Sequence, residues 1–239
     1  MQIQSSIFNV SFYRIENIKK VFLENYQMFD GFNEPSILPI PDNGPSEIPR
    51  IVLESKNGHS QINISQDTVS LLIKYDNDYL EDWELCNKYI EKKQNVIGEF
   101  LDLISNDKLK FSGLTTTMFT DLSVDDATNF LKDRLVTSEL SSTFENIFDI
   151  NTRITSVVEE KYFENITFEN IRVYEDQNEI MTAGFQNDQI SNNVAITVDI
   201  NDRYLFNTNP NYVSDKKNFP RILEISTATI DKYSNYFEK

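Results

Sequence analysis

The sequence predicts an α+β fold in which antiparallel β-meanders make up two halves, each closed by a long amphipathic helix. Three observations lead to this prediction. Short β-branched and aromatic runs alternate with turn residues, helical periodicity marks residues 79–104 and 220–237, and this order of elements occurs twice. The expected halves are residues 1–142 and 143–239, which a chain of 239 residues can also combine in a single domain.

The N-terminal segment is expected to contain a strand, a helix and a long loop. Residues 3–12 are rich in β-branched and aromatic side chains, and residues 16–26 place apolar side chains on one side of a helix. Residues 29–49 hold five of the seven prolines. Because proline fixes φ and lacks a backbone donor, we expect a loop there.

The next segment predicts an antiparallel meander. Two β-rich runs, residues 51–55 and 61–64, flank Asn57-Gly58. Asn-Gly is the favoured two-residue hairpin turn because both residues tolerate positive φ. A third strand is expected over residues 69–75.

Residues 79–104 predict a long helix whose apolar stripe includes Trp83 and Cys86 and is interrupted by Lys93. A strand is expected over residues 115–122. A capping-box pattern at residues 123–126 then opens a helix that extends through Leu135.

The second half is expected to repeat this order. Strand-like runs lie near residues 154–158, 167–174, 179–185 and 194–206. In the last run, Val194, Ile196, Val198 and Ile200 alternate with other residues, which is typical of a half-buried strand. Pro220 opens the terminal helix.

Four short motifs accompany this order of elements. They are Pro49-Arg50 before the first hairpin, Trp83 at the head of the long helix, Gly113-Leu114 in a strand, and Val198-Asp199-Ile200 in a strand that precedes a helix. In these motifs the chain resembles, over most of its length, a sporadically distributed family of uncharacterised bacterial proteins. In that family the Gly-Leu strand continues with Arg and Tyr, whereas Thr115 and Thr116 follow here. The resemblance implies the fold and a bacterial setting, and it implies no activity.

Composition favours a protein of the cytoplasm. Acidic residues number 38 and basic residues 22, for a net charge of −16, and this charge disfavours general binding to nucleic acid. The chain lacks a run of eighteen apolar residues, so no membrane span is expected. A signal peptide is not visible at the N-terminus, and a single cysteine cannot form an internal disulfide.

Residues that usually carry chemistry are scarce. The chain has one histidine, one cysteine and six glycines, without a P-loop or a dinucleotide motif. His59 follows a turn and Cys86 lies on a helix stripe, so both have structural explanations. Asp199 and Asp202 are explained as turn residues at a strand end. We therefore expect no cofactor and no metal, and we lean towards a protein that is not an enzyme.

One pattern supports an alternative. Pro41-Asp42, followed after eleven residues by Glu54-Ser55-Lys56, matches the Pro-Asp…Glu-x-Lys pattern of metal-dependent nucleases. In such enzymes two carboxylates hold Mg²⁺ and the lysine helps to activate water. The alternative function is therefore a nuclease that uses Asp42, Glu54 and Lys56 with Mg²⁺.

The expected function is a non-enzymatic protein-interaction module, as in an accessory, immunity or defence-associated bacterial protein. Its acidity predicts a basic protein partner and binding that weakens with salt. Tyr233, Tyr236 and Phe237 are expected to form an exposed aromatic edge on the terminal helix, where a partner or a second copy of the chain would bind. A further alternative is a DNA-mimic inhibitor, which requires a regular double row of carboxylates.

Overall fold

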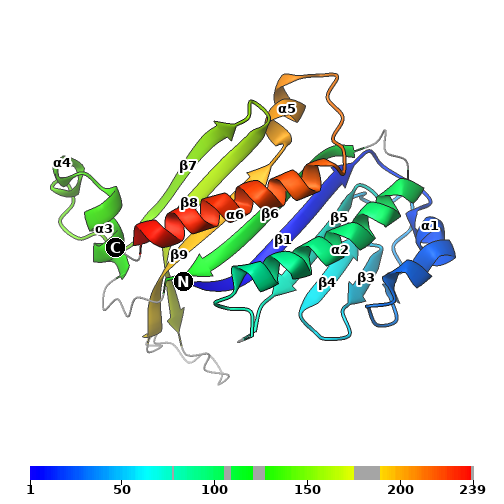
Figure 1. The fold of residues 1–239 in the computed structure, drawn as a ribbon, viewed down its shortest axis with the longest axis horizontal. Helices are drawn as coiled ribbons and strands as arrows, with labels where there is room; N and C mark the ends of the chain where they lie inside the picture. The colour runs from blue at the N-terminus through cyan, green and yellow to red at the C-terminus, as the bar shows by residue number, and fades with distance from the viewer. Residues whose placement is uncertain (77, 105–108, 121–126, 175–188, 238–239) are drawn as a thin grey trace.

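Nine strands form one antiparallel sheet in the computed structural model, which describes residues 1–76, 78–104, 109–120, 127–174 and 189–237 (Figure 1). The strands, in chain order, are β1 (Gln2–Phe12), β2 (Ser36–Ile37), β3 (Ile51–Glu54), β4 (Ser60–Ile64), β5 (Thr68–Lys74), β6 (Leu109–Phe119), β7 (Asn151–Val158), β8 (Tyr162–Tyr174) and β9 (Gln189–Asn201). Their order across the sheet is β2-β3-β4-β5-β1-β6-β9-β8-β7. The α+β prediction is confirmed. The division into two meanders is not, because β6 of the first expected half pairs with β9 of the second, and all nine strands belong to one sheet.

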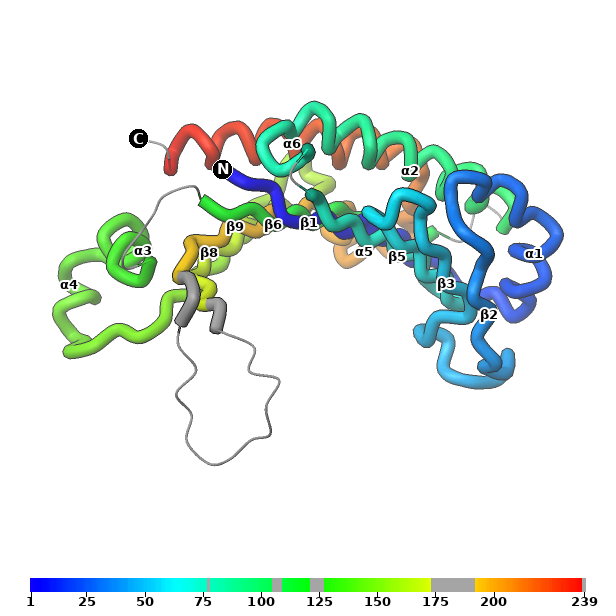
Figure 2. Tube along the Cα trace, turned by 90° about the horizontal axis from the view of Figure 1, so that it is seen from below, coloured from blue at the N-terminus to red at the C-terminus, as the bar shows by residue number. Residues whose placement is uncertain are grey.

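Two long helices cover one face of this sheet. The helices are α1 (Ile18–Asn25), the 3₁₀ helix η1 (Tyr26–Phe29), α2 (Trp83–Leu103), α3 (Ala127–Leu135), α4 (Ser138–Ser141), α5 (Arg203–Thr208) and α6 (Asn218–Phe237). Figures 1 and 2 show α2 and α6 side by side on the same face. None of the helices in the described ranges is long and apolar enough to span a membrane.

The hydrophobic core lies between the sheet and these two helices. Strand residues that face the helices are buried, as the burial of every second residue shows for Phe8 on β1, Leu114 on β6 and Val198 on β9. The predicted apolar stripe of α2 meets them, with Cys86 and Phe100 fully buried. The apolar side chains at every second strand position and those of the helical stripe therefore pack into the same core.

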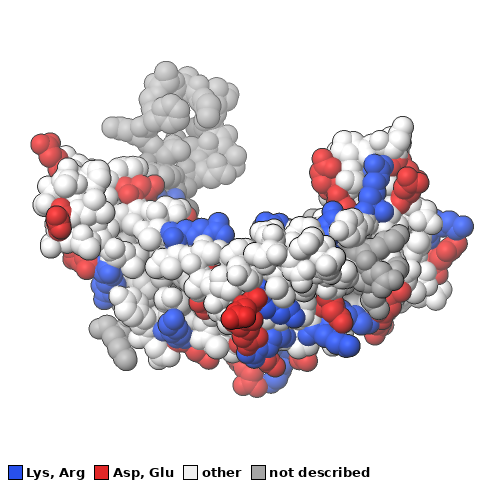
Figure 3. Space-filling model, turned by 90° about the horizontal axis from the view of Figure 1, so that it is seen from above, with Lys and Arg blue, Asp and Glu red and all other residues white. Residues whose placement is uncertain are grey.

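The opposite face of the sheet, here called the helix-free face, is covered by neither α2 nor α6. In Figure 2 the sheet curves away from these helices on both sides, and Figure 3 shows the resulting hollow. Helix α5 lies over one end of this face, because Phe206 packs on Phe111 and Tyr204 packs on Phe163 with ring centroids 5.4 Å apart in each pair.

Several strand boundaries differ from the sequence prediction, and the two-residue strand β2 lies within residues 29–49, which were expected to be a loop. The boundaries of β6 and β9 have clear causes. Strand β6 begins at Leu109, six residues before the expected start, because Leu109 pairs with Phe12 of β1, a contact between distant residues. Strand β9 ends at Asn201, and residues 204–206 are helical, because the buried carboxylate of Asp202 accepts a hydrogen bond from the Ser112 backbone and ends the strand. The strand expected at 179–185 and the capping box at 123–126 lie outside the described residues.

The predicted hairpin around Asn57-Gly58 forms between β3 and β4, but its turn differs from the prediction. Only Gly58 has positive φ (77°) in the β3–β4 connection, which spans more than the two residues expected. Glu159 and Glu160, between β7 and β8, have φ of 55° and 51°, the signs that a type I′ turn requires. Glycine or asparagine usually occupies such positions, so this tight turn had no signal in the sequence.

Candidate functional site

The two edges of the sheet are built differently. Strand β2 forms one edge with only two residues, Ser36 and Ile37. Pro35 precedes it, and Pro39 and Pro41 follow. Short edge strands and prolines leave few backbone groups to which another strand can bind. This edge is therefore closed to strand addition.

Strand β7 forms the other edge and is open. All eight residues, from Asn151 to Val158, pair with β8 without a bulge. Six of the eight are exposed, including Ile154 at 50% and Val157 at 45%. Within the described ranges, no backbone or side-chain hydrogen bond reaches the outer side of β7, and Figure 1 shows no helix or strand along it. Alternate residues of β7 thus present free N–H and C=O groups.

Two carboxylates lie one strand behind this open edge. Glu164 and Glu169 project from β8 to opposite faces beside β7. In the described part of the chain neutral donors hold them: Ser156 Oγ donates to Glu164 at 2.6 Å, and Asn151 Nδ2 donates to Glu169 at 2.9 Å. Neither carboxylate has a cationic partner among the described residues.

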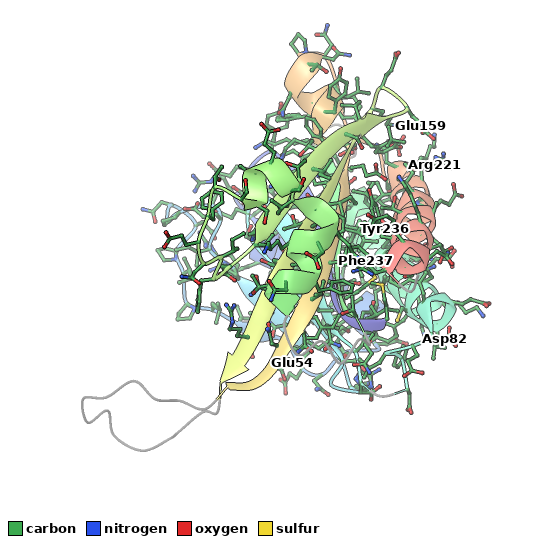
Figure 4. The ribbon with its side chains drawn as sticks, turned by 90° about the vertical axis from the view of Figure 1, so that its left-hand side faces the viewer. Glu54, Asp82, Glu159, Arg221, Tyr236 and Phe237 are labelled. Carbon is green, nitrogen blue, oxygen red and sulfur yellow. The ribbon has the colours of Figure 1, made fainter. Side chains whose placement is uncertain are left out.

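The turn at the end of the open edge carries one firm ion pair. The Arg221 guanidinium on α6 donates to the Glu159 carboxylate, with Nε 3.0 Å from Oε1, and Figure 4 shows the two side chains meeting. This hydrogen bonding holds the pKa of Glu159 below its ordinary value. The pair ties the β7–β8 turn to α6.

The residues of the predicted nuclease pattern lie apart. The backbone carbonyl of Asp42 accepts from Gln66 Nε2 at 3.0 Å, near the start of β3, and its carboxylate lies 3.8 Å from Lys19 Nζ. Arg50, the residue before β3, donates to the carbonyl of Pro41, next to Asp42. Glu54 ends β3, four residues beyond Arg50 and so about 13 Å further along. The strand therefore separates the two carboxylates, whose proposed role in holding Mg²⁺ requires them to meet.

Lys56 has different neighbours again. Its Nζ donates to the Asp30 carbonyl at 2.5 Å, and it lines a hollow of about 700 Å³ beside η1. Among the residues that the structure describes, no group of three or more His, Cys, Asp or Glu side chains is arranged to hold a metal ion.

The aromatic residues of α6 are only partly exposed. Tyr236 is 51% exposed, as expected, whereas Phe237 is 2% exposed. The Phe237 ring packs on Phe130 and Phe168 with centroids 5.9 and 5.4 Å away, and Tyr233 also packs on Phe168. The expected exposed aromatic edge therefore reduces to Tyr236, and Figure 4 shows its position at the end of the helix.

The lone histidine and cysteine have separate surroundings. His59 Nε2 lies 3.4 Å from the Asp76 carboxylate. Cys86 is fully buried and its Sγ donates to the Tyr79 carbonyl at 3.4 Å. Burial raises the pKa of the Cys86 thiol to about 12, so it is protonated and unreactive near neutral pH.

Asp202, which was predicted from the sequence to be a turn residue, organises a buried hydrogen-bond network. It is fully buried and accepts hydrogen bonds from Ser112 N, Tyr212 Oη, Ser214 Oγ and Asn218 Nδ2. Its partners come from three separate segments, which is why spacing along the chain does not reveal it. They join the end of β9 to the start of α6.

Comparisons with known proteins do not test the resemblance suggested by the sequence motifs. No protein-family model matches the chain, and no curated protein matches it either. The bacterial family suggested by the short motifs therefore stays a prediction.

Proposed function

We propose that the protein is an interaction module that takes up an extended, basic segment of a partner protein as an additional strand along β7. The observation that supports the proposal is the open edge itself. Its eight residues pair regularly with β8 and are mostly exposed, whereas the other edge of the same sheet is closed. Backbone hydrogen bonds of the open edge would supply affinity, and side chains beside it would supply specificity.

The strand order supports this use of β7. Starting from the β1–β6 pair, β5, β4, β3 and β2 follow on one side and β9, β8 and β7 on the other, so the third strand out is β3 on one side and β7 on the other. Strands β3 and β7 thus occupy corresponding positions. The outer side of β3 is covered by β2, whereas the outer side of β7 has no such cover within the described ranges. A partner strand would take the place at β7 that β2 takes at β3.

Charge favours a basic segment. Glu164 and Glu169 lie one strand behind the edge, and the β7 residues in front of them, Ser156 and Asn151, have short side chains. A lysine or arginine on an added strand spans the roughly 10 Å to these carboxylates with its long side chain. The net charge of −16 adds long-range attraction that salt would screen.

A peptide-binding experiment tests the proposal. The probe is a labelled eight-residue peptide with two lysines five positions apart, so that they project to opposite faces, and with threonine or valine elsewhere. Binding is measured by fluorescence anisotropy at low and high salt. We expect binding that weakens with salt. The same peptide with glutamate in place of lysine should bind at least about tenfold more weakly, because it meets like charges.

Matched variants assign the binding to the edge. Ile154→Lys places a charge on the exposed edge, as natural proteins do to prevent strand pairing, and should weaken binding at least about tenfold. Leu140→Lys, at a position that is 53% exposed on α4, makes the same charge change elsewhere and should have little effect. Equal peptide binding by the two variants would contradict this proposal. A dimer of the chain that dissociates only in Ile154→Lys would show instead that the open edge binds a second copy.

Glu164→Gln sharpens the electrostatic part. The glutamine keeps an acceptor for Ser156 and Thr229 but loses the charge, so the salt dependence of peptide binding should fall. Glu24→Gln, at an exposed position of α1, is the control and should leave the salt dependence unchanged. A role as an accessory, immunity or defence-associated protein would follow from the identity of the partner, which affinity capture with wild type and Ile154→Lys in parallel would reveal.

A further inference from the structure

A small polar hollow lies on the helix-free face, away from the open edge. Its volume is about 210 Å³, and we call it the Gly113 dimple. It is lined by residues of three adjacent strands and the start of α5: Asn9, Phe111, Gly113, Thr115, Asp199, Asn201 and Arg203. Two of the short sequence motifs, Gly113-Leu114 and Val198-Asp199-Ile200, meet there because β6 pairs with β9.

Glycine at position 113 keeps the dimple open. A Cβ atom built there would lie 2.7 Å from the Asn201 Cβ, closer than real side chains approach. Asn9 and Asn201 flank this position on the neighbouring strands. The floor of the dimple is therefore bare backbone between two amide side chains.

The dimple contains one oriented cation. The Arg203 guanidinium stacks on the Phe111 ring, 4.1 Å from its centroid, and Phe111 is in turn fixed by Phe206. Among the described residues the guanidinium has no carboxylate partner and makes no hydrogen bond. Stacking leaves the planar fork of N–H donors free, and this fork matches a carboxylate in two parallel hydrogen bonds.

The dimple also contains one oriented anion. The Asp199 carboxylate accepts from Thr115 Oγ1 at 3.3 Å, from Asn165 Nδ2 at 3.0 Å and from Asn201 Nδ2 at 3.2 Å. These donors are neutral, and the Arg153 guanidinium forms a long ion pair with the same carboxylate at 4.0 Å. Neutral hydrogen bonds thus hold the carboxylate in place at the wall of the dimple, where an incoming ammonium group can meet it.

We infer that the Gly113 dimple is a binding site for a small zwitterion of amino-acid size, whose carboxylate is held by Arg203 and whose ammonium group faces Asp199. A fixed cation and a fixed anion in one hollow select a ligand that carries both charges. A phosphate or a dicarboxylate would meet Asp199 as a like charge, and a simple amine would meet Arg203 as one. The Asn9 amide, which makes no hydrogen bond among the described residues, offers a donor and an acceptor to the same ligand.

Titration followed by NMR of the ¹⁵N-labelled full chain tests this inference. The probes are L-alanine, acetate and ethylammonium. We expect L-alanine to shift the backbone amide signals of Gly113 and Asn201 at lower concentration than either comparison compound. Acetate binding as tightly as L-alanine, or shifts spread over the surface without a maximum at the dimple, would overturn the inference.

Three variants separate the two charges. Arg203→Gln should weaken L-alanine binding at least about tenfold, because charge-assisted hydrogen bonds are lost. Lys74→Gln removes a positive charge from the same face outside the dimple and should leave binding unchanged. Asp199→Asn should weaken L-alanine binding and strengthen acetate binding, an inversion that loss of structure alone cannot produce. Because the dimple lies on β1, β6 and β9, its failure would leave the peptide-binding proposal at β7 intact.

Discussion

The two edges of the sheet differ, because the β2 edge is closed and the β7 edge is open. Beside the β2 edge, the proline-rich loop is held by the buried side chain of Arg50, which donates to the carbonyls of Ile48 and Pro45 at 2.6 and 3.1 Å. Beside the β7 edge, the described side chains are mostly exposed. The side-chain hydrogen bonds of Ser156 and Asn151 are made to β8, on the inner side of the edge strand.

The difference shows that the unpaired backbone groups are protected at one edge of the sheet and left accessible at the other. Unpaired edges invite pairing with other chains, and proteins commonly block them with short strands, prolines or charges. This chain uses the first two devices at β2 and neither at β7. Among the described residues, the open edge is therefore the long edge of the sheet that neither of these two devices blocks.

The largest expected effect concerns the support behind the open edge. Phe237→Ala should lower the free energy of unfolding by about 3–5 kcal/mol, because it removes a buried ring that packs on Phe168 of β8. Tyr236→Ala, its exposed neighbour, should change it by less than about 0.5 kcal/mol. Chemical denaturation of both variants measures the difference, and equal losses would contradict the burial of Phe237.

The next effect concerns the closed edge. Arg50→Met should cost at least about 3 kcal/mol of unfolding free energy, because the carbonyls of Pro41, Pro45 and Ile48 lose their buried donor. The control is Arg14→Met, an exposed arginine that also donates to this loop, at the carbonyl of Asp42. Thermal unfolding should separate the two, and new self-association of Arg50→Met would show that the β2 edge has opened.

The turns beside the two edges should respond with opposite signs. Gly58→Ala forces a side chain into positive φ and should destabilise the protein by about 1 kcal/mol. Glu160→Gly relieves the same cost in the β7–β8 turn and should stabilise it by up to about 1 kcal/mol. Denaturation midpoints of the two variants that move in the same direction would contradict this account of the turns.

The smallest effect is a pH dependence at the open edge. Arg221 lowers the pKa of Glu159 in the folded protein, so this pair contributes stability above the unfolded pKa of glutamate and loses it as pH falls through the folded pKa. Glu159→Gln should therefore lower the melting temperature slightly at neutral pH and not in acid. Glu160→Gln, next to it, serves as the control, and a deficit of Glu159→Gln that persists in acid would rule out the ion pair as its cause.

Local signals predicted much of the fold. The long helix α2 and strands β1, β3 and β5 were expected close to their observed places, because a stripe with helical period or a short β-branched run depends on neighbouring residues only. Lys93 is an instructive exception to the stripe. It is 7% exposed, its Nζ lies 4.1 Å from the Phe32 ring centroid, and burial lowers its pKa. A long aliphatic stem let a charged residue follow an apolar stripe.

The candidate sites were much less predictable. The C-terminal aromatics were expected to be exposed together, but the rotation of α6 on the sheet buries Phe237 and leaves Tyr236 outside. The dimple needs Gly113 beside Asn201, and Arg203 on top of Phe111, and these pairs are about ninety residues apart in sequence.

By itself, the sequence determined the α+β class, the main helices and strands and the acidic charge, since each depends on composition or on residues close together in the chain. Only the tertiary structure decided which strands lie at the edges, because that follows from the pairing of β6 with β1 on one side and with β9 on the other, between strands far apart in the sequence. The open edge at β7 exists because, in the part of the chain that the structure describes, β7 pairs with β8 on one side and with no strand on the other, and no local pattern in residues 151–158 records that outcome.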